Sequence, residues 1–283
     1  MPTTYAHWRF GDRVKRTLSL DTEAIIDKYR ELYDIGVHGP DLFFYYDCLK
    51  KENLFSFGSK LHDCSMRSLL EQFRDPYLKS DNRQASLAYI LGFVSHFTLD
   101  SYCHSYIEMK KEKEGPSHNK IESQYDRHLL LIDGKDPNRT RVADTIKASE
   151  FNARIVRQFF SQFDQKTMYK IIHDQHFYLT LLKDTNDVKR FILTTGMKAM
   201  KLNDFLDLLT TKVDEPSCEN SNMRLDKLFE KAALHYRALA ENAIDYLENG
   251  AELDPYFEND FAETDDYMSI PLYDANKEKD YIV

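Results

Sequence analysis

Hydrophobic residues along this chain recur mostly at spacings of three and four, which is the period of an α-helix. Strand-like alternation of polar and apolar residues is nearly absent. Asp21 and Ser117 are candidate N-caps for two of the segments. The pattern predicts an all-α fold, as a single multi-helix domain with a buried central helix. The segments with the helical pattern are 21–34, 39–51, 57–73, 81–109, 117–131, 140–163, 165–182, 184–209 and 223–249.

The segment 81–109 is apolar nearly all round between Leu87 and Phe97, which is typical of a helix in the middle of a bundle. It also carries His96, Asp100 and His104, each four residues from the last. Residues four apart on a helix are offset by only about 40°, so the three side chains share one stripe. Because an unpaired buried carboxylate is costly, Asp100 needs positive charge beside it. Metal ions would supply that charge.

His118 and Glu122, again four residues apart, follow on the next predicted helix after a Gly-Pro break. Two antiparallel helices joined by a short loop could face each other, so that His104 meets this pair. Two imidazoles and one carboxylate with room for water make the pattern of an open catalytic zinc site. His96 and Asp100 need a third ligand, for which His62 on the preceding helix is the candidate.

Charge is distributed unevenly along the 283 residues. The net charge is −9, yet residues 252–283 hold ten Asp or Glu and two Lys, a net of −8. The nearly neutral body has no basic footprint for duplex nucleic acid. We therefore expect a helical domain over residues 1–251 and, over 252–283, an acidic, largely non-helical tail that is extended along the surface or partly disordered.

Four scattered cysteines without a CxxC motif are typical of free thiols in a reducing compartment. The first residues contain no apolar run of signal-peptide length, and no segment approaches the roughly 20 apolar residues of a membrane span. These features predict a cytoplasmic protein. No basic amphipathic stretch is evident, so contact with a membrane is expected to be peripheral at most.

Five short motifs together resemble the zinc-dependent phospholipase C family, whose fold is shared with single-strand-specific nucleases. They are "AHWRFG", "GPDLFF", "KLHD", "LGFVSHFTLDSYCH" and "HNKIE", within residues 5–130. The resemblance implies an all-helical domain with two to three zinc ions. It also implies a role for each matching residue: His62, His96 and Asp100 bind one zinc, His104, His118 and Glu122 a second, Asp100 bridges to a third zinc that also takes His7, and Asp41 is the general base.

One departure from the family lies at the N-terminus. Secreted members begin with a processed Trp whose amine and carbonyl complete the third zinc site, whereas this chain begins Met-Pro. Removal of Met1 would expose the imine nitrogen of Pro2 as a substitute ligand, which is a hypothesis.

The function expected from the residues and the resemblance is hydrolysis of a phosphodiester by a metal-activated water, with a phospholipid or a small phosphoester as substrate. Three alternatives remain. The adjacent His62–Asp63 pair, with His38 and Asp100, would suit a helical HD-type phosphohydrolase. A nuclease on the same scaffold would need a positive groove that the body does not supply. A zinc-stabilised helical protein without turnover is the third.

Overall fold

The structure, a computed structural model, describes residues 4–183, 186–199, 203–209 and 213–283. Over these ranges it contains helices and loops and no strand, which confirms the all-α prediction. The α-helices are α1 (Thr4–Val14), α2 (Leu20–Lys28), α3 (Arg30–Gly36), α4 (Phe55–His62), α5 (Met66–Lys79), α6 (Arg83–Glu114), α7 (His118–Ile132), α8 (Glu150–Arg157), α9 (Gln165–Leu182), α10 (Asp187–Ala199), α11 (Glu219–Asn249) and α12 (Ala275–Asp280). Among the shorter 3₁₀ helices, η2 (Gly39–Tyr45), η3 (Val142–Thr145) and η4 (Asn203–Leu208) border the site described below.

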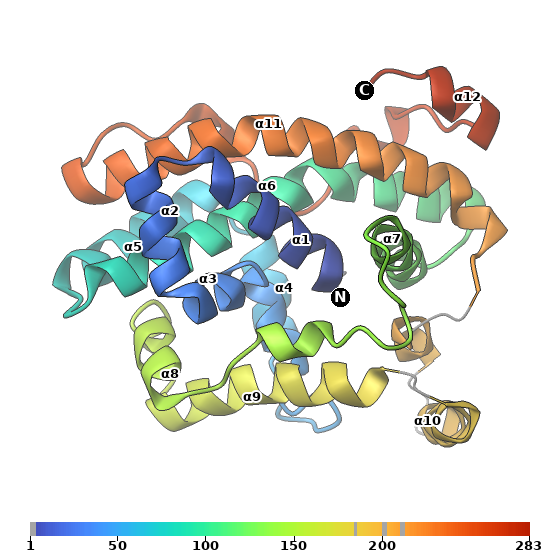
Figure 1. The fold of residues 1–283 in the computed structure, drawn as a ribbon, viewed down its shortest axis with the longest axis horizontal. Helices are drawn as coiled ribbons and strands as arrows, with labels where there is room; N and C mark the ends of the chain where they lie inside the picture. The colour runs from blue at the N-terminus through green and yellow to red at the C-terminus, as the bar shows by residue number, and fades with distance from the viewer. Residues whose placement is uncertain (1–3, 184–185, 200–202, 210–212) are drawn as a thin grey trace.

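Helix α6 is the centre of the fold. In Figure 1, α11 and α9 run along opposite edges of the molecule, with α6, α1 and α4 between them. Every residue of α6 from Ala85 to Asp100 is buried, as its apolar sequence predicts. The helix begins where the Asn82 side chain accepts the Ala85 N–H at 3.1 Å. It ends at Gly115, whose φ of 85° is the left-handed conformation that favours glycine at a helix C-terminus.

Two glycines let α3 approach the backbone of α6. A Cβ atom on Gly36 would lie 2.2 Å from the carbonyl oxygen of Tyr89, and one on Gly92 would lie 2.3 Å from that of Tyr33. Any larger residue would therefore push the two helices apart. Because α3 leads directly into η2, this contact also holds Asp41 beside α6.

Two of the predicted helices are each divided in two. The segment 57–73 forms α4 and α5, because the Ser65 hydroxyl accepts the Ser68 N–H and starts a new helix. The segment 21–34 forms α2 and α3, with the break at Tyr29. The predicted Asp21 cap is wrong, since Ser19 caps α2 by accepting the Thr22 N–H at 3.2 Å.

Two later predictions also need correction. The segment 140–163 is helical over only half of its length, in η3 and in α8, which starts where Ser149 accepts the Asn152 N–H. Of the helix predicted over 184–209, residues 184–185 and 200–202 lie outside the described residues, and the remainder forms α10 and η4. In contrast, α7 begins at its predicted cap, where Ser117 accepts the Lys120 N–H at 3.1 Å.

Helices α6 and α7 do not run side by side as an antiparallel pair. Figure 1 shows α6 lying across the view while α7 is seen end-on, so the two helices cross. The three-residue connection from Gly115 to Ser117 turns the chain sharply enough for this arrangement. The crossing brings only the first turns of α7 against the later part of α6, which is where their predicted ligands lie.

The acidic tail lies mostly at the surface and inserts four buried side chains, those of Leu253, Phe257, Phe261 and Glu278, into the fold. Phe257 and Phe261 are fully buried, and their rings lie 5.8 and 5.3 Å from that of Phe97 on α6. Farther along, Glu278 forms a buried ion pair with Arg224 of α11 at 2.6 Å. The two buried phenylalanines anchor the tail to the core, although most of its residues stay at the surface. No helix among the described residues has the length and apolar character needed to cross a membrane.

Candidate metal centre

The stripe predicted on α6 lies at the centre of a cluster of imidazoles and carboxylates. His96 and Asp100 are buried, with exposed fractions of 0% and 2%, and His104 is half-buried. Asp100 lies between the two imidazoles. Its Oδ2 atom is 2.9 Å from Nε2 of His96, and its Oδ1 atom is 3.5 Å from Nε2 of His104. One carboxylate therefore faces both histidines, as the four-residue spacing predicts.

Three other elements bring further ligand-type side chains to the buried end of this stripe. Helix α1 brings His7, whose Nε2 atom lies 3.1 Å from Asp100 Oδ1. Its ring stacks on His96 with the ring centroids 4.1 Å apart. Helix α4 ends at His62. The Nε2 atom of His62 lies 3.1 Å from Oδ1 of Asp41 in η2. The other oxygen of Asp41 is 3.6 Å from Nε2 of His96.

The first turns of α7 complete the cluster at its more exposed end. His118 Nε2 lies 2.9 Å from Glu122 Oε1, and His104 Nε2 lies 3.7 Å from the same oxygen. The imidazoles of His104 and His118 have their centroids 5.2 Å apart. The predicted meeting of these three side chains across the Gly-Pro break is therefore present, although the helices cross.

Within the described residues, the ligand-type atoms form three groups in which the atoms lie within 4.8 Å of one another. Two of these groups share His96. The sequence expectation set Asp41 apart as a base, whereas here it lies among the ligand-type side chains. The groups are His7, His96 and Asp100; Asp41, His62 and His96; and His104, His118 and Glu122.

The atoms of the cluster converge without satisfying one another. Both carboxylate oxygens of Asp41, Nε2 of His96, Oδ2 of Asp100 and Oε2 of Glu122 are buried and have no hydrogen-bond partner of acceptable geometry among the described residues. This holds even for His96 Nε2 and Asp100 Oδ2, which are only 2.9 Å apart. Buried polar atoms are nearly always paired in proteins, so these atoms are arranged for cations placed between them. The donor set of imidazoles and carboxylates is one that zinc accepts.

A model of the zinc-dependent phospholipase C family matches residues 6–169. The match spans more than half of the chain and includes all the side chains of the cluster. The chain belongs to this family. No curated protein and no solved structure matches it. The family description implies a zinc-dependent hydrolase of phosphoester bonds with a lipid substrate. Pro2, the hypothetical substitute for the N-terminal Trp of secreted family members, lies outside the described residues.

Backbone carbonyls and one further carboxylate orient the imidazoles of the cluster in this member of the zinc-dependent phospholipase C family. Nδ1 of His62 lies 2.9 Å from the carbonyl oxygen of Gly58, and Nδ1 of His96 lies 3.2 Å from that of Val37. Each ring therefore donates from Nδ1 and turns a lone pair on Nε2 toward the carboxylates, as metal-ligating histidines do.

For His118 the orienting group is Glu108, whose Oε1 atom lies 2.5 Å from Nδ1. A carboxylate behind a ligating imidazole fixes the ring and increases its basicity. Sequence reasoning missed Glu108, although it lies four residues after His104 and continues the same stripe by one turn.

Asp126 fixes the position of His7. Its carboxylate accepts the backbone N–H groups of Tyr5 and Ala6 at 2.9 and 2.7 Å. These N–H groups belong to the first turn of α1, where no intrahelical acceptor exists. Asp126 therefore holds the first turn of the helix that carries His7.

Mutual contacts shift the pKa values within the cluster. Burial would raise the pKa of Asp100, but the neighbouring imidazoles, His104 foremost, hold it well below its usual range. Burial lowers the pKa of His118, yet Glu122 and Glu108 outweigh it and raise the pKa to about 9. The hydrogen bond from His118 lowers the pKa of Glu108 to about 2. Asp100 and Glu108 are thus ionised at neutral pH, and the proton on His118 is one that zinc must displace.

Gly39 sets the distance between η2 and α6. Its φ of 48° is left-handed, and a Cβ atom there would lie 2.4 Å from the His96 ring. A larger residue would displace the imidazole or η2 with Asp41. Of the residues expected for an HD-type site, His38 is buried with its pKa lowered to about 3 by burial, and Asp63 is exposed. Neither belongs to a ligand group in the described part of the chain.

The cluster opens to solvent through a pocket of about 200 Å³. Ligand-type side chains of two of the three groups lie on its wall, together with the Phe44 ring. Two exposed acids, Asp63 and Glu263, lie at its rim. A separate space of about 20 Å³ lies deeper, between His7, Asp100 and His104. The wall of the larger pocket is formed by Asp41, Phe44, Ser59, His62, Asp63, His104, His118, Glu122, Ala262 and Glu263.

Proposed function

We propose that this protein hydrolyses a phosphodiester in the manner of a phospholipase C, with two to three zinc ions in the cluster and a metal-activated water as the nucleophile. The observation that carries the proposal is the convergence of three ligand groups, two of them sharing His96, beside a pocket open to solvent that side chains of two of the groups line. Zinc ions held in this way lower the pKa of bound water to about 7 and neutralise charge that develops on phosphate oxygens.

The side chains would divide the work as follows. The groups around Asp100 and Glu122 would hold the ions. The Nδ1 contacts of His62, His96 and His118 would keep their imidazole rings in the orientation that binds metal. Asp41 would orient the attacking water and accept its proton, while its contacts with two imidazoles also make it a candidate ligand.

The rival functions receive less support. An HD-type site would need the exposed Asp63 as a ligand and would leave Glu122 unused. Binding of single-stranded nucleic acid needs a positively charged groove, whereas Asp63 and Glu263 make the rim of the pocket acidic. A zinc-binding protein without turnover would have no need for a pocket that reaches the cluster.

The test is hydrolysis of phosphatidylcholine in detergent micelles by the zinc-loaded protein, followed by phosphorus NMR. We expect a phosphomonoester and diacylglycerol as products, loss of activity with a chelator, and recovery with added zinc. Cleavage of soluble phosphodiesters alone would favour the small-phosphoester alternative. A fully zinc-loaded protein that cleaves none of these substrates would refute the proposed reaction.

Peripheral contact with a lipid surface would occur through α10. None of the described side chains of this helix is buried, and Val188, Phe191 and Ile192 are 70%, 71% and 63% exposed on one face. The helix holds three basic residues against one acidic residue in a chain of net charge −9. The sequence pattern did not identify α10 as a basic amphipathic stretch, although an apolar stripe with basic flanks is typical of helices that lie in the interface of an anionic membrane. Helix α10 lies between α9 and η4 along the chain. In η4, Asp207 accepts a hydrogen bond from the Ser117 hydroxyl at the start of α7.

Replacement of Phe191 by aspartate is expected to reduce binding to anionic vesicles about tenfold, because a large apolar side chain no longer enters the interface. Co-sedimentation of the protein with vesicles of phosphatidylcholine and phosphatidylserine would measure the bound fraction. Leu234→Asp is the matched control, since Leu234 is 85% exposed on α11. Equal binding by the two variants would contradict a docking role for α10.

A further inference from the structure

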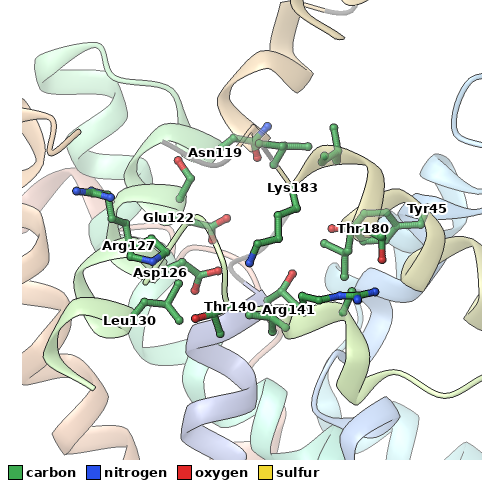
Figure 2. Close-up of a pocket in the computed structure, with 18 residues that line it drawn as sticks. Tyr45, Asn119, Glu122, Asp126, Arg127, Leu130, Thr140, Arg141, Thr180 and Lys183 are labelled. Atoms are coloured by element: carbon green, nitrogen blue, oxygen red, sulfur yellow. The ribbon is translucent and has the colours of Figure 1, made fainter. Parts of the chain in front are cut away.

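A second pocket adjoins the metal centre. It has a volume of about 140 Å³ and lies between α7, residues 137–143 and the C-terminal end of α9 (Figure 2). Glu122 lines this pocket as well as the mouth of the cluster, so the two spaces meet at a side chain of the metal centre. Leu130, Val142 and Leu182 provide apolar walls. The volume is below the roughly 300–1,000 Å³ of pockets for drug-sized ligands, so a headgroup fits it and acyl chains do not.

The Lys183 side chain enters the middle of this pocket, as Figure 2 shows. Its backbone is fixed at the end of α9, where its N–H donates to Leu179 and its carbonyl accepts from Lys189 at 2.6 Å. Within the described part of the chain, the Lys183 amine has neither an ion pair nor a hydrogen bond. Burial lowers the pKa of Lys183 to about 8, and the charges of Asp136 and Asp144 offset this effect only in part.

The acids that line the pocket have other partners. Asp126 accepts two backbone N–H groups of α1, and Glu122 faces the imidazoles of His104 and His118. Across the pocket from Lys183 lies a second cation, Arg141, which is largely exposed and 3.3 Å from Asp144. The pocket therefore offers positive charge whose natural complement would come from a ligand.

We propose that this pocket binds an anionic group, a second phosphate or a carboxylate, carried by the headgroup of the phosphoester substrate, with Lys183 as its ion-pair partner and Arg141 beside it. This inference rests on the proposed function for its substrate. The two pockets that share Glu122 would then differ in charge. The rim with Asp63 and Glu263 repels anions, and the pocket with Lys183 attracts them. The preferred substrate is then a phosphodiester whose headgroup bears an additional negative charge.

The kinetic test compares two soluble glycerophosphodiesters, one with a glycerol headgroup and one whose glycerol headgroup carries a second phosphate. For the wild type we expect a KM about tenfold lower for the phosphorylated headgroup. Lys183→Met keeps the stem and removes the charge, so it should raise KM about tenfold for that substrate alone, with kcat within about twofold. Lys231→Met, at an exposed lysine of α11, is the matched control. A wild type without preference, or a Lys183 variant impaired equally on both substrates, would overturn the proposal.

A second measurement does not depend on turnover. Lysines of the zinc-loaded protein are acetylated with and without glycerol 3-phosphate, and modification is quantified by mass spectrometry. The proposal expects this probe to protect Lys183 several-fold and to leave Lys231 unchanged. Protection of Lys183 in a protein that cleaves no phosphoester would refute the proposed reaction and retain the pocket. Turnover without headgroup preference and without protection would refute the pocket alone.

Discussion

Replacing Asp100 by asparagine is expected to reduce zinc content from two to three ions per chain to one or none, and to lower kcat/KM for a phosphodiester by at least about 10³-fold. The amide keeps the shape of the side chain, so packing around α6 is preserved. It removes the one negative charge that faces His7, His96 and His104 together. Mass spectrometry of the metals and a phosphodiesterase assay on the same preparation measure both effects.

The control for this variant is Asp174→Asn on α9. Asp174 is also a buried carboxylate, 7% exposed, but its partners are Lys170 and the backbone N–H of Asp47, away from the ligand groups. It should keep its zinc and its activity. If Asp100→Asn retains full zinc content and activity, the cluster is not the metal centre. Comparing the melting of both variants without metal separates a loss of ligand from a loss of fold.

Parts of the fold governed by local rules could be predicted from the sequence. The long apolar run predicts the buried helix α6, and the Ser117 hydroxyl predicts where α7 begins. The breaks inside 57–73 and 140–163 were missed because Ser65 and Ser149 read as ordinary polar positions within a helical period. Each of them instead starts a new helix by capping it. The hydrophobic pattern does not reveal such a cap, because the residues on both sides of the serine keep the helical period.

The site divides along similar lines. Spacings of four on one helix identified His96, Asp100 and His104, and the same rule extends to Glu108. No local signal reveals the role of Asp126, because its partners are backbone N–H groups about 120 residues earlier in the chain. Tertiary contact likewise decides that Asp41 lies between two imidazoles. Its position depends on the close approach of α3 to α6, which a sequence pattern does not report.

The charge of residues 252–283 concealed their packing. Net charge and the absence of a helical period predicted a tail that is extended along the surface or partly disordered, but did not reveal that Phe257 and Phe261 are buried against Phe97. A few large aromatic residues bury enough apolar surface to fix a segment whose other residues are acidic. Phe261 also lies against the His62 and His96 rings, so the tail helps to hold the ligands in place.

Removal of zinc is expected to destabilise the protein, and by more at pH 9 than at pH 6. In the metal-free cluster the pKa of His118 is about 9, above its unfolded value, owing to Glu122 and Glu108. A raised pKa means that protonated His118 contributes its full stability below pH 6.5 and loses it as the pH rises through about 9. The loss amounts to about 3 kcal/mol. Zinc, in contrast, requires neutral imidazoles and binds more tightly over the same range.

The two trends add, so the difference in Tm between zinc-loaded and chelated protein should grow by roughly 5–10 °C from pH 6 to pH 9. Calorimetry at both pH values measures the difference, and urea unfolding of the chelated protein isolates the contribution of His118. His118→Gln should flatten the pH dependence of the metal-free protein, whereas His173→Gln, at an exposed position of α9, should leave it as in the wild type. A metal-free protein equally stable at both pH values would show that His118 is not held in its charged form by Glu122 and Glu108. The clustered carboxylates would then have to be balanced by His7 and His62, whose pKa values are also raised. Measuring His7→Gln and His62→Gln in the same way would identify the imidazole responsible.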